Sequence, residues 1–241
     1  MVKMRWMGVS FLLLFMCCLP GQRSGPEIGF DEHLNLGLKF MEQENYPMAR
    51  KEFGMALNIN PKSARVNNLM GLAYFHEQNY DLAERYFQKA IQLEPRFVLG
   101  YLNLGGVYAM KQLYPRARQY YEKALSLSPD LVGAYYSLGA ICFQMGDREA
   151  AHNYLMKALE LDPDYLEKNR PSLIGLPMSG SYLAELYFSF ARIYADLEDL
   201  DRTIEYLNQA RNYGFRDWKR LLEEREFEKI KDHPRIREFL K

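Results

Sequence analysis

The sequence predicts an all-α solenoid, a row of stacked helix pairs, because residues of one type recur at one fixed interval. Glycine, alanine and proline each return every 34 residues, four times in succession. The series are Gly37, Gly71, Gly105 and Gly139; Ala49, Ala83, Ala117 and Ala151; and Pro61, Pro95, Pro129 and Pro163. A period of this length spans one helix-turn-helix unit, so the chain is expected to repeat that unit in tandem.

The pattern of apolar residues inside one unit is the second observation. In the third unit the first helix carries Tyr101, Leu104 and Tyr108 at helical spacing, and the second helix carries Ala117 and Tyr121. A proline stands just past each second helix, which it cannot continue. The periodic glycines and alanines are expected where two helices approach closely. One pair cannot bury its apolar face alone, so the pairs must stack.

This 34-residue pattern resembles the tetratricopeptide repeat, with four repeats at 30–63, 64–97, 98–131 and 132–165. The family's signature sites at positions 7 and 11 hold Leu36, Met70, Leu104 and Leu138, and then Phe40, Tyr74, Tyr108 and Cys142. At position 4 the family's usual tryptophan is replaced by His33, Asn67, Tyr101 and Tyr135. The resemblance implies a right-handed superhelix with a concave face.

The repeat pattern returns after a break and then gives way to a cap. Ala191 and Leu207 fit a degenerate fifth repeat at 184–217. The segment between, 166–183, holds two prolines and two glycines and is predicted to be an inserted loop. Residues 218–241 are predicted to form two short amphipathic helices that cover the apolar face of the last repeat. A separate partner-binding helix is the alternative.

Residues 1–25 have the pattern of an export signal. A basic start is followed by roughly a dozen apolar residues, and Pro20 ends the run short of the length that a spanning helix needs. The residues around Cys17 and Cys18 resemble a bacterial lipoprotein signal, which implies lipid attachment at one of these two cysteines. Cleavage without lipid, an uncleaved anchor and a buried helix of the fold are the alternatives.

Composition and motifs argue against several functions. Thirty-one Lys and Arg balance thirty-one Asp and Glu, so no positive excess indicates a nucleic-acid partner. The pairs Tyr120-Tyr121 and Tyr135-Tyr136 are interpreted as packing residues rather than as a platform for bases. The histidines lack metal-ligand spacing, and no phosphate loop or nucleophile motif is present, so no metal, cofactor or catalytic residue is expected. Cys142 is interpreted as a buried structural thiol. The protein is not expected to be an enzyme.

The resemblance implies that residues of the first helices line the concave face. The candidate peptide-binding residues are Asn68, Leu69, Leu72, Phe75, Leu102, Asn103, Met110, Tyr136, Phe143 and Gln144. Most are apolar and three are amides, which suits an extended or helical apolar segment. One branch of the family binds the acidic tails of chaperones through basic residues, an arrangement called a carboxylate clamp. Leu34 and Leu99 stand where that branch has basic residues, so no such clamp is expected. Alternatively, the apolar insert at 166–183 covers the groove.

Together these features predict a non-catalytic scaffold that binds another protein or peptide in its groove. The export signal predicts a location in the periplasm or on the outer surface of a bacterial membrane, with lipid tethering as one route. A lipoprotein-like start followed by helix pairs resembles, in architecture, bacterial pilus-biogenesis lipoproteins that assist secretin assembly. The alternative is a subunit that recruits substrate for an enzyme complex.

Overall fold

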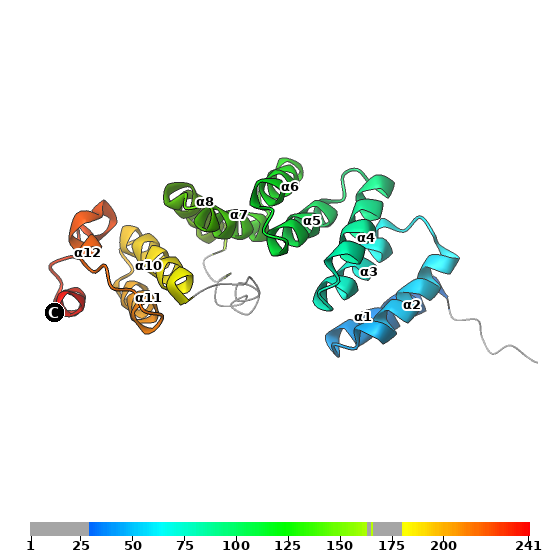
Figure 1. Cartoon of the computed structure of the whole chain (residues 1–241), viewed down its shortest axis with the longest axis horizontal. Coiled ribbons are helices and arrows are strands. Elements are labelled where there is room, and N and C mark those ends of the chain that lie inside the picture. The colour runs from blue at the N-terminus through cyan, green and yellow to red at the C-terminus, as the bar shows by residue number, and fades with distance from the viewer. Residues whose placement is uncertain (1–28, 163–164, 166–179) are drawn as a thin grey trace, which may run out of the picture.

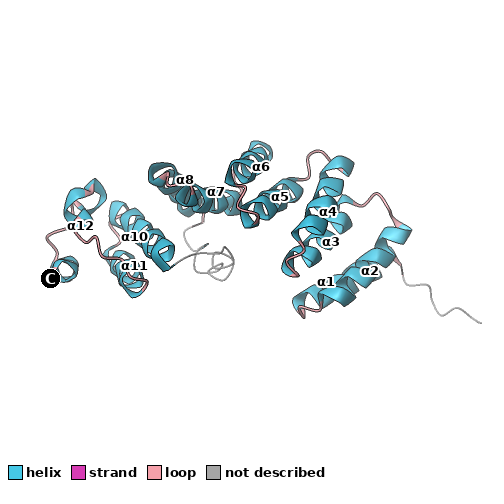
Figure 2. Cartoon of the chain, in the orientation of Figure 1, coloured by secondary structure: helices cyan, strands magenta, loops and turns pink. Residues whose placement is uncertain are grey.

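The computed structural model of the chain describes residues 29–162, residue 165 and residues 180–241. In this part of the chain every regular element is a helix and no strand is present (Figure 2). None of these helices combines the length and the apolarity needed to cross a membrane. The predicted export signal at 1–25 and most of the predicted insert at 166–183 lie outside the described residues.

Five helix pairs follow one another in an arch (Figure 1). They are α1 (Phe30–Glu42) with α2 (Tyr46–Ile59), α3 (Ala64–His76) with α4 (Tyr80–Leu93), α5 (Val98–Met110) with α6 (Tyr114–Leu127), α7 (Val132–Gln144) with α8 (Arg148–Leu161), and α10 (Gly180–Asp196) with α11 (Leu200–Asn212). The short helices α12 (Arg220–Glu223) and α13 (Pro234–Arg237) follow, each with a 3-10 turn after it. The buried apolar residues form three successive clusters along the arch, as stacking of neighbouring pairs requires.

The four periodic glycines bring the two helices of each of the first four pairs together. Each lies against a large buried side chain of its partner helix, so closely that a Cβ atom on the glycine would overlap it. The distances from an ideal Cβ to that side chain are 2.3 Å from Gly37 to Phe53, 2.5 Å from Gly71 to Phe87, 2.4 Å from Gly105 to Tyr121 and 2.7 Å from Gly139 to Leu155. The predicted close approach of the helices at these glycines is therefore confirmed.

The turn inside each pair is built the same way. The residue before the N-cap of the second helix has a positive φ, at Glu44, Gln78, Gln112, Gly146 and Glu198. In four pairs the N-cap side chain then accepts a hydrogen bond from the backbone N–H three residues later, as Asp147 does from Ala150 at 3.1 Å. Such caps satisfy N–H groups that the helix itself leaves unpaired, and they fix where the second helix begins.

Stacked aromatic rings join the two helices within several of the pairs. Tyr108 stacks on Tyr120 with the ring centroids 5.1 Å apart, and the Arg116 guanidinium lies 5.2 Å from the centroid of the Tyr108 ring. Equivalent stacks join Tyr74 with Tyr86 and Tyr194 with Tyr206. These tyrosines pack within the repeats, where each such pair adds about 0.5–1.5 kcal/mol beyond the burial of apolar area.

The fifth pair begins earlier than the repeat pattern predicts. The predicted loop extends to residue 183, whereas α10 begins at Gly180, so its first turn precedes the predicted repeat start at 184. A glycine costs about 1 kcal/mol in a helix interior, and less in the first turn, where the N–H groups have no intrahelical partner. The composition of the segment therefore did not stop the helix from extending toward the N-terminus.

The C-terminal residues pack on α10 as a cap. Phe227 and Ile236 are fully buried in one cluster with Phe188 of α10. The cap also makes ion pairs with this helix, because the Arg192 guanidinium lies 2.6 Å from a Glu226 carboxylate oxygen and 2.5 Å from a Glu224 oxygen. The solenoid with a helical C-terminal cap agrees with the fold class that the sequence predicts.

Candidate binding groove

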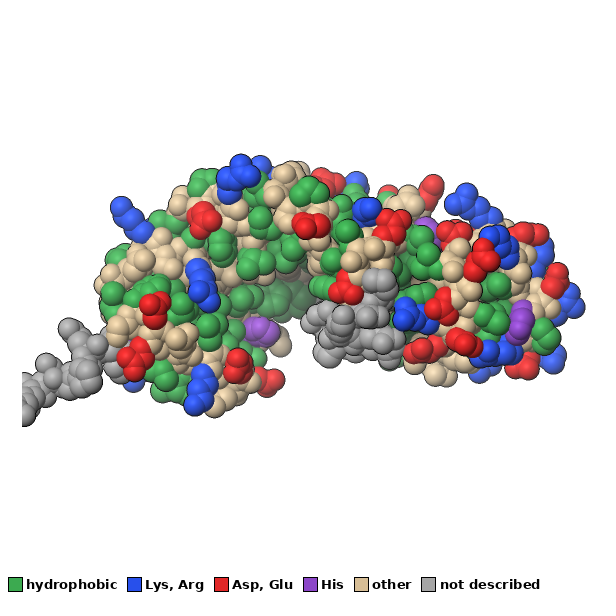
Figure 3. Space-filling model, turned by 180° about the vertical axis from the view of Figure 1, so that it is seen from behind, with side chains coloured by type: hydrophobic (Ala, Val, Ile, Leu, Met, Phe, Trp, Pro, Cys, Tyr) green, Lys and Arg blue, Asp and Glu red, His purple; other side chains and the backbone are tan. Residues whose placement is uncertain are grey.

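The inner side of the arch carries an apolar pocket. Figure 3 shows hydrophobic side chains gathered in the hollow of the arch, while charged groups are spread over the arms on either side. The pocket has a volume of about 500 Å³ and lies between α3, α5 and α7, the first helices of three successive pairs. It therefore exists only because neighbouring repeats stack.

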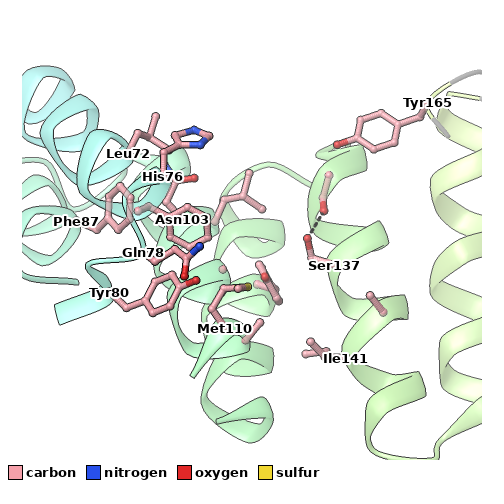
Figure 4. Close-up of a pocket in the computed structure, with 17 residues that line it drawn as sticks. Leu72, His76, Gln78, Tyr80, Phe87, Asn103, Met110, Ser137, Ile141 and Tyr165 are labelled. Carbon is pink, nitrogen blue, oxygen red and sulfur yellow. Dashed lines mark hydrogen bonds between the residues drawn. The ribbon is translucent and has the colours of Figure 1, made fainter. Parts of the chain in front are cut away.

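The polar groups of the pocket are few. Asn103 on α5 donates a hydrogen bond from Nδ2 to Oδ1 of Asn68 on α3, at 2.8 Å. Ser137 on α7 donates to the backbone oxygen of Gly133, also at 2.8 Å. Figure 4 shows Asn103 and Met110 on one wall and Ser137 and Ile141 of α7 on the other. The amide pair links two repeats and leaves the Asn103 side-chain oxygen available as an acceptor.

Among the residues that the structure describes, no Asp, Glu, Lys or Arg side chain lines the pocket. Burial raises the pKa of the Tyr121 hydroxyl, although a hydrogen bond with Ser137 acts the other way. Burial also raises the pKa of Tyr165, followed by the negative charge of Asp162. Both phenols are therefore protonated and neutral near pH 7. A largely apolar wall whose described residues include no carboxylate, ammonium or guanidinium group favours an uncharged ligand, since an unpaired charge is costly to desolvate.

Six of the ten predicted groove residues meet at this pocket. Leu72, Phe75, Leu102, Asn103 and Met110 line it. Asn68 lies behind the lining, where it is 4% exposed and accepts the hydrogen bond from Asn103. Asn68 was predicted to contact the ligand, but in the structure its amide orients the amide of Asn103 instead.

The other four predicted residues are not in the pocket. Tyr136 is 2% exposed and stacks on Tyr165, with the ring centroids 4.8 Å apart. Phe143 is 8% exposed and packs in the cluster of the fourth and fifth pairs. Leu69 packs with the core of the first two pairs, and Gln144, at the end of α7, is outside the lining. The prediction of Tyr136 and Phe143 as open groove residues is corrected, because Tyr136 is buried against Tyr165 and Phe143 is buried in the cluster that joins the fourth and fifth pairs.

Part of the lining comes from residues that the prediction did not include. Gln78 comes from the α3–α4 turn and Tyr80 from the start of α4, while Ile141 and Tyr165 come from the fourth pair and the chain after it. His76, in contrast, stands at one of the positions that the family resemblance places on the concave face; it lines the pocket and stacks on Tyr46, with ring centroids 5.1 Å apart. The prediction took only certain positions of the first helices, so it had no means of finding the turn residues. Whether the predicted insert at 166–183 covers the groove concerns residues outside those described.

The described ranges offer no arrangement of catalytic or metal-binding groups. No three His, Cys, Asp or Glu side chains within them are grouped so that they could hold a metal ion. Cys142 has no exposed surface, and burial raises the pKa of its thiol, which keeps it protonated. A buried protonated thiol is a poor nucleophile.

Comparison with known protein families agrees with the helical architecture. Sequence models described as "Tetratricopeptide repeat" match residues 64–97, 97–164 and 184–210, which together make up more than half of the chain. The chain belongs to the tetratricopeptide repeat family. The family fold is generally a non-catalytic scaffold for protein interaction, and no enzyme family is among the matches. No curated protein matches the chain in sequence.

Solved structures share this tetratricopeptide fold at low sequence identity. PilF of Pseudomonas aeruginosa is 23% identical, with 84% of this chain and 96% of that chain covered and a TM-score of 0.54. A thermophilic tetratricopeptide protein of Thermus thermophilus is 17% identical, with 81% and 96% covered and a TM-score of 0.55. YrrB, a tetratricopeptide protein with an unusual peptide-binding site, is 18% identical, with 76% and 85% covered and a TM-score of 0.50.

Proposed function

We propose that this tetratricopeptide protein is a scaffold of the bacterial cell envelope that binds an apolar peptide or helix of another protein in its concave groove. The uncharged pocket between α3, α5 and α7 carries the proposal, because it combines an apolar wall with the amide of Asn103. An apolar segment gains free energy from burial there, while the amide can pair with its backbone. The peptide-binding site of YrrB, a protein of similar fold, is consistent with this function.

The location proposed is the periplasm or the outer surface of a membrane, with lipid tethering through Cys17 or Cys18. The basic and apolar start of the sequence supports export. Mass spectrometry of the mature protein tests it. We expect an N-terminal cysteine at position 17 or 18 carrying lipid mass, because a multiply acylated cysteine anchors firmly. An intact N-terminus on a protein that stays in the cytoplasm would contradict export.

Assistance in assembling a pilus or a secretin is the most specific form of the proposal. The lipoprotein-like start and the helix pairs support it, and PilF has a similar fold. A substrate-recruiting subunit of an enzyme complex remains the second candidate, since the same groove would serve it. The two differ in the captured partner, which is an envelope component in one case and an enzyme or its substrate in the other.

Photocrosslinking tests the groove as the site of partner binding. The crosslinking amino acid p-benzoylphenylalanine is placed at Met110, which lines the pocket, or at Met55, which is 41% exposed on α2 and lies outside it. In cells that naturally make the protein, we expect a discrete adduct from position 110 and none from position 55. The variant Leu102→Asp should abolish the adduct, because it places a charge in the apolar wall.

Leu113→Asp is the matched control for Leu102→Asp. Leu113 is 44% exposed, lies outside the pocket and stands at the N-cap of α6, where Asp is a favourable residue. This variant adds the same charge and should leave the adduct unchanged. Equal adducts from positions 110 and 55, or equal loss with both Asp variants, would place the partner elsewhere on the protein.

A further inference from the structure

The apolar side chains on the inner side of the arch become smaller in the third repeat. At two equivalent positions of the first helices, the first and second repeats carry Leu38 with Met41 and Leu72 with Phe75. The third repeat carries Gly106 with Ala109 at the same positions, and the fourth has Ala140 at the first of them. Gly106, Ala109 and Ala140 all line the pocket. We call these three residues the socket floor.

The space in the socket floor lies at Gly106, whereas Ala109 and Ala140 line the pocket with only 2% and 3% of their surface exposed. An ideal Cβ atom on Gly106 would have its nearest neighbours at 3.9 Å, the Tyr121 hydroxyl, and 4.0 Å, the Phe75 ring. The adjacent Gly105 differs sharply, because its Cβ would lie 2.4 Å from the Tyr121 ring. Packing between helices therefore explains Gly105 but not Gly106. A large side chain in this helix position would fill the pocket instead of meeting a neighbour.

Resting on the proposed function, we propose that the socket floor binds one large apolar side chain of the partner, of the size of Phe, Leu or Met, within an uncharged segment. Large side chains in well-packed pockets carry most of the energy of many interfaces. The described part of the lining offers no Asp, Glu, Lys or Arg side chain to pair with a charge, which selects against charged neighbours of the anchor. The Asn103 oxygen accepts a hydrogen bond from the backbone N–H of the bound segment.

Selection from a random dodecapeptide library displayed on phage, followed by calorimetric titration of a synthetic peptide, tests the socket. The full-length protein should enrich peptides that share one large apolar residue and lack charge around it. Replacing that residue of the synthetic peptide by Ala should weaken binding by about 30-fold or more. This arm uses the unaltered protein, so its result does not depend on how a protein variant folds.

The variant Gly106→Leu fills the socket from the protein side. This variant should weaken the binding of the selected peptide by about 30-fold or more. The matched control is Gly54→Leu, which adds the same side chain to α2 where a Cβ meets nothing within 4 Å, outside the pocket. Gly54→Leu should bind the peptide as the original protein does. Circular dichroism verifies that both variants keep their helix content.

Three outcomes would overturn the socket. They are an enriched motif dominated by charged residues, a peptide that binds Gly106→Leu as tightly as the original protein, and no enrichment over the empty matrix. If the partner still crosslinks to position 110 while Gly106→Leu leaves that adduct intact, the proposed function stands and the socket alone fails. If the protein that carries no Gly106→Leu change gave no adduct at position 110, the proposed function itself would be contradicted.

Discussion

Replacing Gly105 by Ala should destabilise the protein by about 2–3 kcal/mol, near the upper end of the usual cost of overpacking. The added Cβ would lie 2.4, 2.5 and 2.9 Å from three carbons of the Tyr121 ring, and that ring is 4% exposed in the packed core. A rigid ring without free space must shift together with its helix. Thermal unfolding followed by circular dichroism should show a melting temperature lower by about 4–12 °C.

The neighbouring glycine provides the control for this change. Gly106→Ala adds the same atom to the same helix but meets no atom closer than 3.9 Å. Alanine favours the helix over glycine by up to about 1 kcal/mol, so this variant should be as stable as the original or more stable. If both variants melted at the same temperature, the close approach of helices at the periodic glycines would not be the reason for the 34-residue pattern.

Replacing Arg192 by Met should cost about 3 kcal/mol and loosen the C-terminal cap. The guanidinium is 15% exposed and pairs with Glu226, whose side chain is 7% exposed. Removing Arg192 takes the closest cation from the buried Glu226 carboxylate. Glu224, the other partner of Arg192, keeps Arg220 at 2.6 Å. Removing one member of a buried ion pair is far more costly than removing both. Denaturant unfolding should show the loss. The double variant Arg192→Met, Glu226→Met should recover most of it, and a double variant no more stable than the single one would contradict the pairing.

The same pair predicts a pH dependence. Burial is the largest single influence on the pKa of Glu226 and raises it, but the hydrogen bond and the charge of Arg192, a backbone hydrogen bond and the charge of His152 together outweigh burial, so the pKa lies below its ordinary value of 4.5. The unfolded chain therefore binds this proton more readily than the folded one. The stabilisation is present above about pH 4.5 and is lost as the pH falls through the lower folded-state pKa. Glu226→Gln should remove this part of the acid dependence of unfolding.

The fold could be predicted because the repeat itself carries the information. The 34-residue interval of Gly37, Gly71, Gly105 and Gly139 requires that all four meet the same kind of neighbour, and each does meet the large side chain of its partner helix. Interruption of the period removed this constraint. The start of α10 at Gly180 was therefore missed, since no repeated residue marks where the fifth pair begins.

The candidate site could be predicted in part, for the same reason. Residues of the second and third repeats, such as Leu72 and Leu102, have a complete repeat on either side, so their positions in the repeat predict that they face the groove. Tyr136 and Phe143 belong to the fourth repeat, next to the break. What covers them, Tyr165 on one side and the fifth pair on the other, does not follow from the period.

Methyl NMR of the alanine-labelled protein tests the central claim, that the concave pocket at the third and fourth repeats holds the apolar segment. Ala109 and Ala140 place methyl groups on the socket floor, and Ala210 on α11 serves as a remote reference. Addition of the selected peptide should shift the Ala109 and Ala140 resonances and leave Ala210 unchanged. A peptide that binds while both floor resonances stay in place, or that shifts all three equally, would contradict the account.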